Sequence, residues 1–128
     1  MSLDLYLEAD NALTVPTLAQ ALKNAGVCEM KVVGDSLQAF FNSGLKVTTD
    51  GEVADSAIYA EDTKGMCFQV SVRCNIRIKG PEPEGYSSME ELDQIAQSIA
   101  QVCSSHFLIS FQFEETLYWR DAAGLHRF

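Results

Sequence analysis

The fold of this chain is decided by one stretch of sequence, residues 68–79, which has the sequence FQVSVRCNIRIK. Its apolar side chains share one parity and are Phe68, Val70, Val72, Cys74, Ile76 and Ile78. Its polar side chains share the other parity and are Gln69, Ser71, Arg73, Asn75, Arg77 and Lys79. Since neighbouring side chains of a strand point to opposite faces, this period of two predicts a long strand with one buried face. The length of the strand favours a central place in an antiparallel sheet.

On the N-terminal side, the sequence predicts a strand and then a helix. Leu3, Leu5 and Leu7 alternate with other residues, which is typical of a half-buried strand. Thr14 is suited to cap the helix that follows, because its hydroxyl can accept a bond from a free N–H of the first turn. Gly26 is suited to end that helix, because glycine readily adopts the left-handed conformation that commonly follows one.

Between this helix and the long strand, the sequence predicts a meander of three short strands. Extended segments bounded by turn residues lie at residues 29–33, 36–41 and 45–49. A further turn is predicted at Asp50-Gly51. Residues 50–62 show no clear period, so we expect a loop there, with or without a short strand near residues 57–60.

On the C-terminal side, the sequence predicts a second helix, a strand and a hairpin. Ser88 followed by Glu91 matches a capping box, in which the serine caps the first turn and the glutamate reaches back. We expect this helix to end near Ser105 and a buried strand to occupy residues 107–113. The remaining residues predict a terminal hairpin, with strands at residues 116–120 and 125–128.

This order of elements favours a single α+β domain over residues 1–128. Two helices packed on one face of a mostly antiparallel sheet would bury the apolar sides of both kinds of element. We expect a ferredoxin-like core with extra hairpins, in which the polar face of the long strand stays exposed.

The charge balance is the most unusual property of the composition. The 128 residues contain 18 acidic and 9 basic side chains, which gives a formal net charge of -9. Binding to nucleic acid or to an anionic membrane needs concentrated Lys and Arg, so neither is expected as a partner. A basic protein would instead be attracted.

The compartment expected from the sequence is the cytoplasm. Residues 1–8 have no basic start followed by an apolar run, so they do not resemble a signal peptide. We therefore expect the cysteines to be thiols; they are Cys28, Cys67, Cys74 and Cys103.

A search for catalytic chemistry favours a protein that is not an enzyme and has no cofactor or metal. Cys67 and Cys74 are separated by an odd number of residues, so a regular strand would place them on opposite faces. His106 and His126 are the only histidines, and no phosphate-binding loop motif occurs. The adjacent pair Glu114-Glu115 is best explained as a solvated strand end.

The acidic residues are concentrated in two stretches without Lys or Arg, at residues 50–62 and 80–119. Clustered carboxylates on loops of a rigid scaffold are suited to binding a partner. Trp119 is added because Trp is a favoured interface anchor. The candidate partner-binding residues are Asp50, Glu52, Asp55, Glu61, Asp62, Glu82, Glu84 and Trp119.

In size, charge and α+β layout, the whole chain resembles the immunity proteins of bacterial contact-dependent growth inhibition and polymorphic toxin systems. The resemblance implies a cytoplasmic protein that binds and blocks a cognate toxin, here a basic nuclease domain, through an acidic surface. It assigns no particular residue and leaves the oligomeric state open. The alternatives are a small-molecule-binding or regulatory ferredoxin-like domain, and a small enzyme built on a reactive cysteine.

Overall fold

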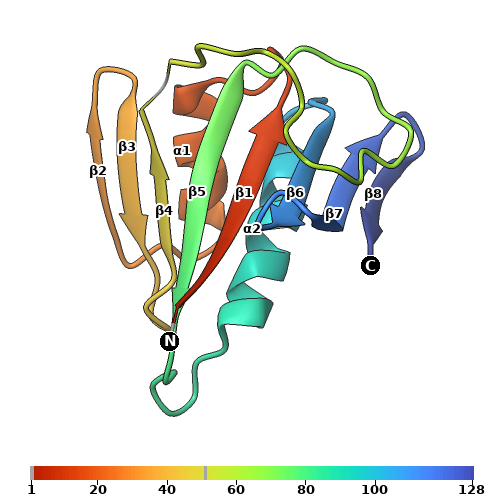
Figure 1. Ribbon diagram of the computed structural model, residues 1–128. Helices are drawn as coiled ribbons and strands as arrows, with labels where there is room; N and C mark the ends of the chain where they lie inside the picture. Colours follow the sequence, from red (N-terminus) through yellow and green to blue (C-terminus); the bar gives the residue numbers. More distant parts are fainter. Residues whose placement is uncertain (1, 51) are drawn as a thin grey trace.

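The computed structural model describes residues 2–50 and 52–128, and it places one eight-stranded sheet at the centre of the fold (Figure 1). The strand order is β2-β3-β4-β5-β1-β6-β7-β8, and every neighbouring pair is antiparallel. The elements, in chain order, are β1 (Ser2–Ala9), α1 (Val15–Asn24), β2 (Glu29–Val33), β3 (Ser36–Phe40), β4 (Lys46–Thr49), β5 (Val72–Lys79), α2 (Ser88–Val102), β6 (Phe107–Phe111), β7 (Glu115–Asp121) and β8 (Gly124–Arg127).

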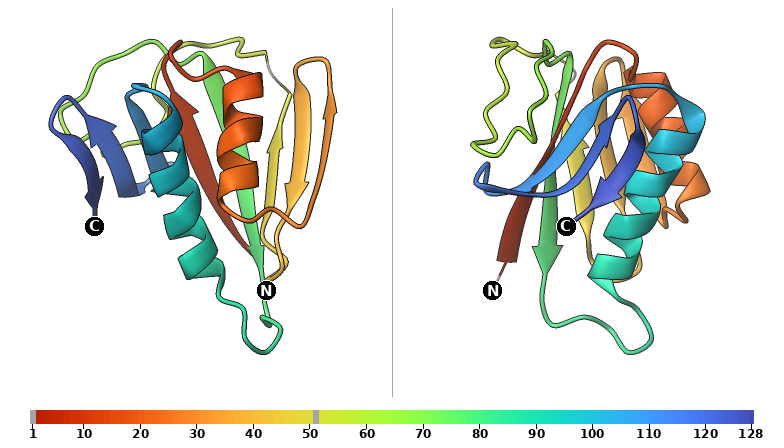
Figure 2. Two further views of the ribbon diagram at one scale, coloured as in Figure 1. Left: turned by 180° about the vertical axis from the view of Figure 1, so that it is seen from behind. Right: turned by 90° about the vertical axis from the view of Figure 1, so that its right-hand side faces the viewer.

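The predicted α+β class with two helices and a mostly antiparallel sheet is confirmed. The order β6-β1-β5-β4, together with α1 and α2, is that of a ferredoxin-like βαββαβ core. Strands β2 and β3 extend this core at one edge of the sheet, and the hairpin β7-β8 extends it at the other. Both helices lie on the same face of the sheet (Figure 2).

The long predicted strand corresponds to β5, which is central as expected because it pairs with β1 and β4. It is shorter than predicted and begins at Val72. The preceding residues keep the alternation of apolar and polar side chains. Ser71 N still donates to Ala9 O on β1 at 2.8 Å, but Val70 N donates to Ser56 O at 2.8 Å and so bonds outside the sheet. The alternation in the sequence therefore extends further toward the N-terminus than the strand itself does.

The first helix is confirmed with both of its predicted ends. Thr14 is the N-cap, and its side chain accepts a hydrogen bond from Thr17 N at 3.3 Å. Gly26 follows the helix with a φ of 93°, a conformation that favours glycine. These signals were predictive because each one acts within a single turn of the chain.

The capping box predicted for α2 is wrong in its register. The N-cap is Ser87, and Ser88 is buried inside the first turn, where its hydroxyl bonds that of Ser43 at 2.8 Å. Glu91 does not reach back to the cap, because its carboxylate accepts a bond from Ser43 N at 3.1 Å. The helix ends at Val102, earlier than the predicted Ser105.

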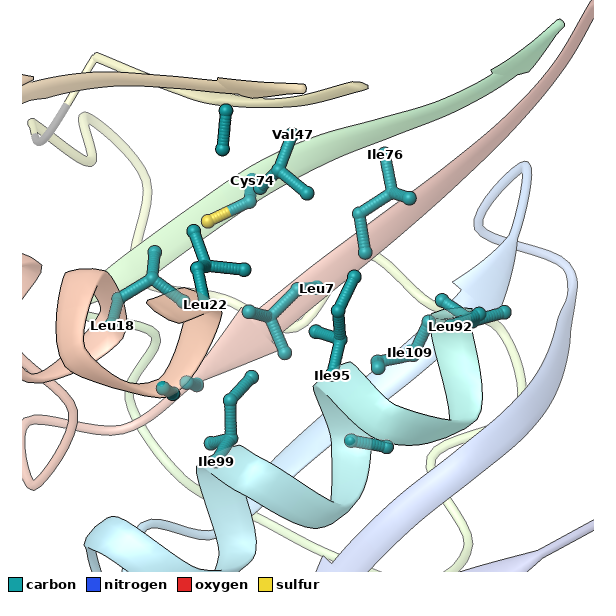
Figure 3. Close-up of a cluster of buried hydrophobic side chains, with 14 of the residues drawn as sticks. Leu7, Leu18, Leu22, Val47, Cys74, Ile76, Leu92, Ile95, Ile99 and Ile109 are labelled. Atoms are coloured by element: carbon teal, nitrogen blue, oxygen red, sulfur yellow. The ribbon is translucent and has the colours of Figure 1, made fainter. Parts of the chain in front are cut away.

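The hydrophobic core lies between the helices and the sheet (Figure 3). Leu7 on β1 and Ile76 on β5 point toward the helices. They lie in one cluster with Leu22 on α1 and with Ile95 and Ile99 on α2, and all five side chains are at most 1% exposed. Fully burying a side chain of this size contributes roughly 1.5–3 kcal/mol to folding. This layer fixes the position of both helices on the sheet.

The strand predicted at residues 107–113 stops at Phe111 because the chain turns. Gln112 and Phe113 have positive φ values of 53° and 62°, which no regular strand allows. The turn carries Phe113 to the side of the sheet opposite the helices, where its ring stacks on Tyr6 with a centroid distance of 3.9 Å.

The sheet face opposite the helices is partly covered by residues 52–71, which we call the strap (Figure 2, right). The strap contains no helix or strand, so the predicted loop is confirmed and the short strand near residues 57–60 is not present. In Figure 1 the strap passes in front of β6 and β7 and leaves β2, β3 and β4 open. The predicted turn at Asp50-Gly51 includes Gly51, which lies outside the described residues.

Candidate functional site

A hollow of about 490 Å³ lies between the end of α1 and the first turns of α2. The loop of residues 80–87 leads into it and projects beyond the sheet (Figure 1). We call this region the acidic hollow; its lining includes Ala25, Tyr86, Met89, Glu90, Glu91 and Asp93. Three of these six residues carry carboxylates, so the region combines a concave shape with negative charge.

Two apolar side chains of the acidic hollow are exposed to solvent. Tyr86 is 48% exposed and Met89 is 51% exposed, although most large apolar residues of the chain are buried. Tyrosine and methionine are enriched in the cores of protein–protein interfaces. An exposed pair of them within one hollow is therefore a candidate anchor for a partner.

The carboxylates around the acidic hollow differ in whether they already bond to other groups of the chain. Glu84 and Glu90 are exposed and have no ion-pair partner or side-chain hydrogen bond among the described residues. Glu91 is engaged by Ser43, and Asp93 accepts a bond from Arg127 Nη2 at 3.2 Å. The hydrogen bond from Arg127 is the main cause that lowers the pKa of Asp93. The negative charge open to a partner therefore comes mainly from Glu84 and Glu90.

The start of α2 holds Glu82 in a structural role. The Ser87 side chain accepts a weak bond from Glu90 N at 3.4 Å, and the Glu82 carboxylate accepts one from Ser88 N. A carboxylate at this position satisfies free N–H groups and complements the positive end of the helix dipole. Glu82, predicted as a partner-binding residue, is therefore committed to the helix terminus.

The strap is held to the sheet by Glu8 and Arg73, which face each other on β1 and β5. The buried carboxylate of Glu8 accepts bonds from Tyr59 N at 2.8 Å and Ala60 N at 3.0 Å. Arg73 donates to Ala57 O at 2.6 Å, and its guanidinium lies 3.9 Å from the Tyr59 ring centroid. This ion pair thus holds residues 57–60 of the strap against the sheet.

The five predicted acidic residues at positions 50–62 lie on or beside the strap, and two of them are internally engaged. Asp55 accepts bonds from Ala57 N and the Tyr59 hydroxyl, which lower its pKa. Asp62 pairs with Lys64 at 2.8 Å, and the hydrogen bond from Lys64 lowers its pKa. The exposed members without such partners among the described residues are Asp50, Glu52 and Glu61.

The structure brings Glu61 to a second acidic segment that is distant in sequence. Glu61 N donates to Phe113 O at 2.7 Å, which places it next to the exposed pair Glu114-Glu115. Thr116 reinforces the contact by donating to Asp62 O at 2.5 Å. This second acidic surface contains no exposed apolar side chain comparable to Tyr86 or Met89, apart from Tyr59.

Trp119 lies on β7, on the sheet face that the strap covers, and it is half-buried. Its ring stacks on that of His126 at a centroid distance of 5.2 Å, and Lys64 Nζ lies 4.6 Å from its centroid. Trp119 therefore belongs with the strap group of predicted residues. Glu82 and Glu84 form a separate group at the loop before α2.

Sequence reasoning missed Tyr86, Met89 and Glu90 as members of one site. The signal available was local: residues 84–91 have the sequence EGYSSMEE, in which carboxylates flank an aromatic residue and a methionine. The end of α1 lies beside this segment only because the two helices pack together, and that packing is not visible in the local sequence. The hollow itself could therefore not be predicted.

Two features are absent from the part of the chain that the structure describes. No group of three or more His, Cys, Asp or Glu side chains there could hold a metal ion. No helix there is long and apolar enough to cross a membrane.

Comparisons with known proteins do not assign the chain to a family. No family model, no curated protein and no solved structure matches it. The function has to be inferred from the two acidic surfaces and their geometry.

Proposed function

We propose that this protein is a cytoplasmic inhibitor of the immunity type, which uses the acidic hollow to bind and block a basic toxin domain. The observation that carries the proposal is that the exposed side chains of Tyr86 and Met89 line one hollow with the exposed carboxylate of Glu90, and that Glu84 lies two residues before Tyr86 on the loop that leads into it. The same region therefore offers apolar contact area and charge to a single partner.

The energetics of such an interface favour this hollow over the strap surface. A few aromatic or large apolar anchors usually carry most of the binding energy, while charged groups at the rim direct the partner and speed association. The acidic hollow has both kinds of group, whereas the exposed Tyr59 ring on the strap already contacts Arg73 and Phe113 within the chain. On the strap, Asp55 and Asp62 are already bonded within the chain, which lowers the charge available there.

A nuclease domain is the partner class that the charge favours. Nucleases bind a phosphate backbone through clustered Lys and Arg, and a surface of carboxylates presents competing negative charge to those cations. The formal net charge of -9 supports this choice, because exposed carboxylates attract a basic domain once it approaches to within a Debye length, about 8 Å at physiological ionic strength. Small-molecule binding, the alternative inferred from the sequence, remains a separate prediction.

The test is protection in cells that co-express the chain with the toxin domain encoded next to its gene. The wild-type chain should restore growth, and the double variant Glu84→Lys/Glu90→Lys should lose protection and bind at least about tenfold more weakly. The matched control is Glu52→Lys/Glu61→Lys, which reverses two exposed carboxylates of the strap region.

Equal loss of protection in both double variants would show that net charge alone directs binding and that the hollow is not the interface. Loss only in the strap variant would place the interface there. No protection by the wild-type chain would remove the immunity proposal. Circular dichroism of both variants, together with their thermal unfolding, confirms that the fold is retained.

A further inference from the structure

The open part of the sheet face, on β3, β4 and β5, carries a second hollow of opposite charge. Its volume is about 230 Å³, and its lining residues are Phe40, Gly44, Lys46, Arg77 and Lys79. We call it the cationic hollow. It contains three of the nine basic residues of the chain, although acidic residues outnumber basic ones two to one.

Strand register brings these side chains together. Lys46 on β4 lies opposite Phe40 on β3 and opposite Arg77 on β5. Lys79 is two residues beyond Arg77 and therefore on the same face. Gly44 closes the rim with a φ of 94°, and a Cβ added there would lie 4.0 Å from Lys79 O.

The cations of this hollow are only partly neutralised by the chain. Arg77 Nε donates to Asp4 at 3.0 Å, and the two terminal nitrogens of its guanidinium have no hydrogen bond among residues 2–50 and 52–128. Lys46 and Lys79 have no carboxylate partner among the described residues. Glu29 on β2 lies opposite Phe40 on β3, so β3 separates it from Lys46 on β4.

Lys46 and Arg77 form a like-charged pair directly across two strands, an arrangement that destabilises a sheet. An anion bound between the two side chains would relieve this repulsion. The overall negative charge of the chain opposes anion binding only weakly, since the Debye length is about 8 Å at physiological ionic strength. Within the hollow, the three nearby cations dominate the field.

We propose that the cationic hollow binds a small phosphate-class anion that carries a flat ring. A phosphate group presents three acceptor oxygens and about -1.5 to -2 charges, which suits three converging cations better than a single carboxylate does. Phe40 is 38% exposed at the edge of the hollow, and Lys46 Nζ lies 5.3 Å from its ring centroid, so the ring offers its edge or its other face to an aromatic ring. The volume is below the range of about 300–1,000 Å³ typical of sites for drug-sized ligands, which favours a small ligand.

This site lies on the sheet face opposite the helices and is independent of the proposed inhibitory function. The probe is phenyl phosphate, compared with inorganic phosphate and benzoate by calorimetry and by NMR shifts of backbone amides. Phenyl phosphate should bind most tightly, and the shifts should centre on residues 40, 44, 46, 77 and 79. Lys46→Gln should weaken its binding at least about tenfold, because a hydrogen bond to a charged group is lost.

The matched control is Lys31→Gln, which removes an exposed lysine on β2 outside the hollow. This variant should bind phenyl phosphate as the wild type does. Phe40→Ala should remove the preference for phenyl phosphate over inorganic phosphate while leaving phosphate binding intact. Thermal unfolding before titration establishes that each variant is folded.

Three results would overturn the proposal. One is the absence of saturable phenyl phosphate binding to the wild-type chain. Another is equal weakening in Lys31→Gln and Lys46→Gln, which would mean a general attraction to the whole face. The third is tighter binding of a single-stranded octanucleotide with shifts across β2 to β5, which would make this face a polyanion surface.

Discussion

Glu8 and Arg73 form an ion pair across β1 and β5, with Arg73 Nη2 at 3.0 Å and Nε at 3.2 Å from the same carboxylate oxygen. The Glu8 side chain is fully buried, and both of its oxygens also accept backbone N–H bonds from the strap. Four donors thus satisfy one carboxylate in the interior. This pair links the two central strands of the sheet to the segment that covers them.

Substitution of Glu8 by Ala should destabilise the protein by about 3–5 kcal/mol, because it leaves a partly buried guanidinium and two strap N–H groups without their acceptor. The free energy of unfolding in urea measures this loss. Hydrogen exchange at Tyr59 and Ala60 should accelerate in the variant. The matched control is Asp4→Ala, which removes the exposed pair with Arg77 and should cost at most about 1 kcal/mol. Equal costs would mean that Glu8 does not anchor the strap.

Acid should remove the stabilising contribution of Asp93. Its pKa is lowered, chiefly by the hydrogen bond from Arg127, so the unfolded chain takes up the proton more readily than the folded one. The contribution is therefore fully present above the ordinary value of 3.8 and is lost as the pH falls below it toward the lowered pKa. The difference in unfolding free energy between wild type and Asp93→Asn should shrink over that interval. A difference independent of pH would contradict the ion pair with Arg127.

The four cysteines should react with a thiol reagent at different rates. Burial raises the pKa of Cys74 to about 12, and its sulfur is enclosed in the core, so it should label only on unfolding. Cys28 and Cys67 are exposed and should label in the native protein. Mass spectrometry after timed labelling distinguishes them, with labelling in denaturant as the control. Rapid labelling of Cys74 in the native state would show that the sheet opens.

Two substitutions on α2 should separate stability from binding. Leu92→Ala removes a fully buried side chain and should cost about 2–5 kcal/mol of unfolding free energy. Met89→Ala truncates a side chain that is 51% exposed and should change stability by no more than about 0.5 kcal/mol. Met89→Ala should nevertheless weaken binding of the toxin domain. Normal binding by this variant would exclude Met89 as an anchor.

Much of the fold could be predicted because its signals are local. The parity of residues 68–79 predicted the buried face of β5, and Thr14 and Gly26 predicted both ends of α1. The errors occurred where a distant partner competed with a local pattern. Ser43, which is 48 residues from Glu91 in sequence, takes the carboxylate that the capping box assigned to the start of α2.

The candidate sites were less predictable than the fold for the same reason. The acidic stretches were visible in the sequence. The hydrogen bonds and ion pair of Asp55, Asp62 and Glu82 depend on the folded backbone, which cannot be predicted from composition. The cationic hollow requires the register of three strands, which a single sequence does not provide. Charge totals therefore favour a kind of partner, but they do not indicate the surface that would meet it.

The position of β1 in the sheet has a consequence for how the chain acquires its structure during synthesis. β1 is made before either of its neighbours, yet Leu7 pairs with Cys74 on one side and Ile109 on the other. Contacts over such sequence separations slow folding, and strands without partners are prone to aggregate. β1 therefore lacks one neighbour until β5 has been made and the other until β6 has been made, and its unpaired edges are open to aggregation over that interval.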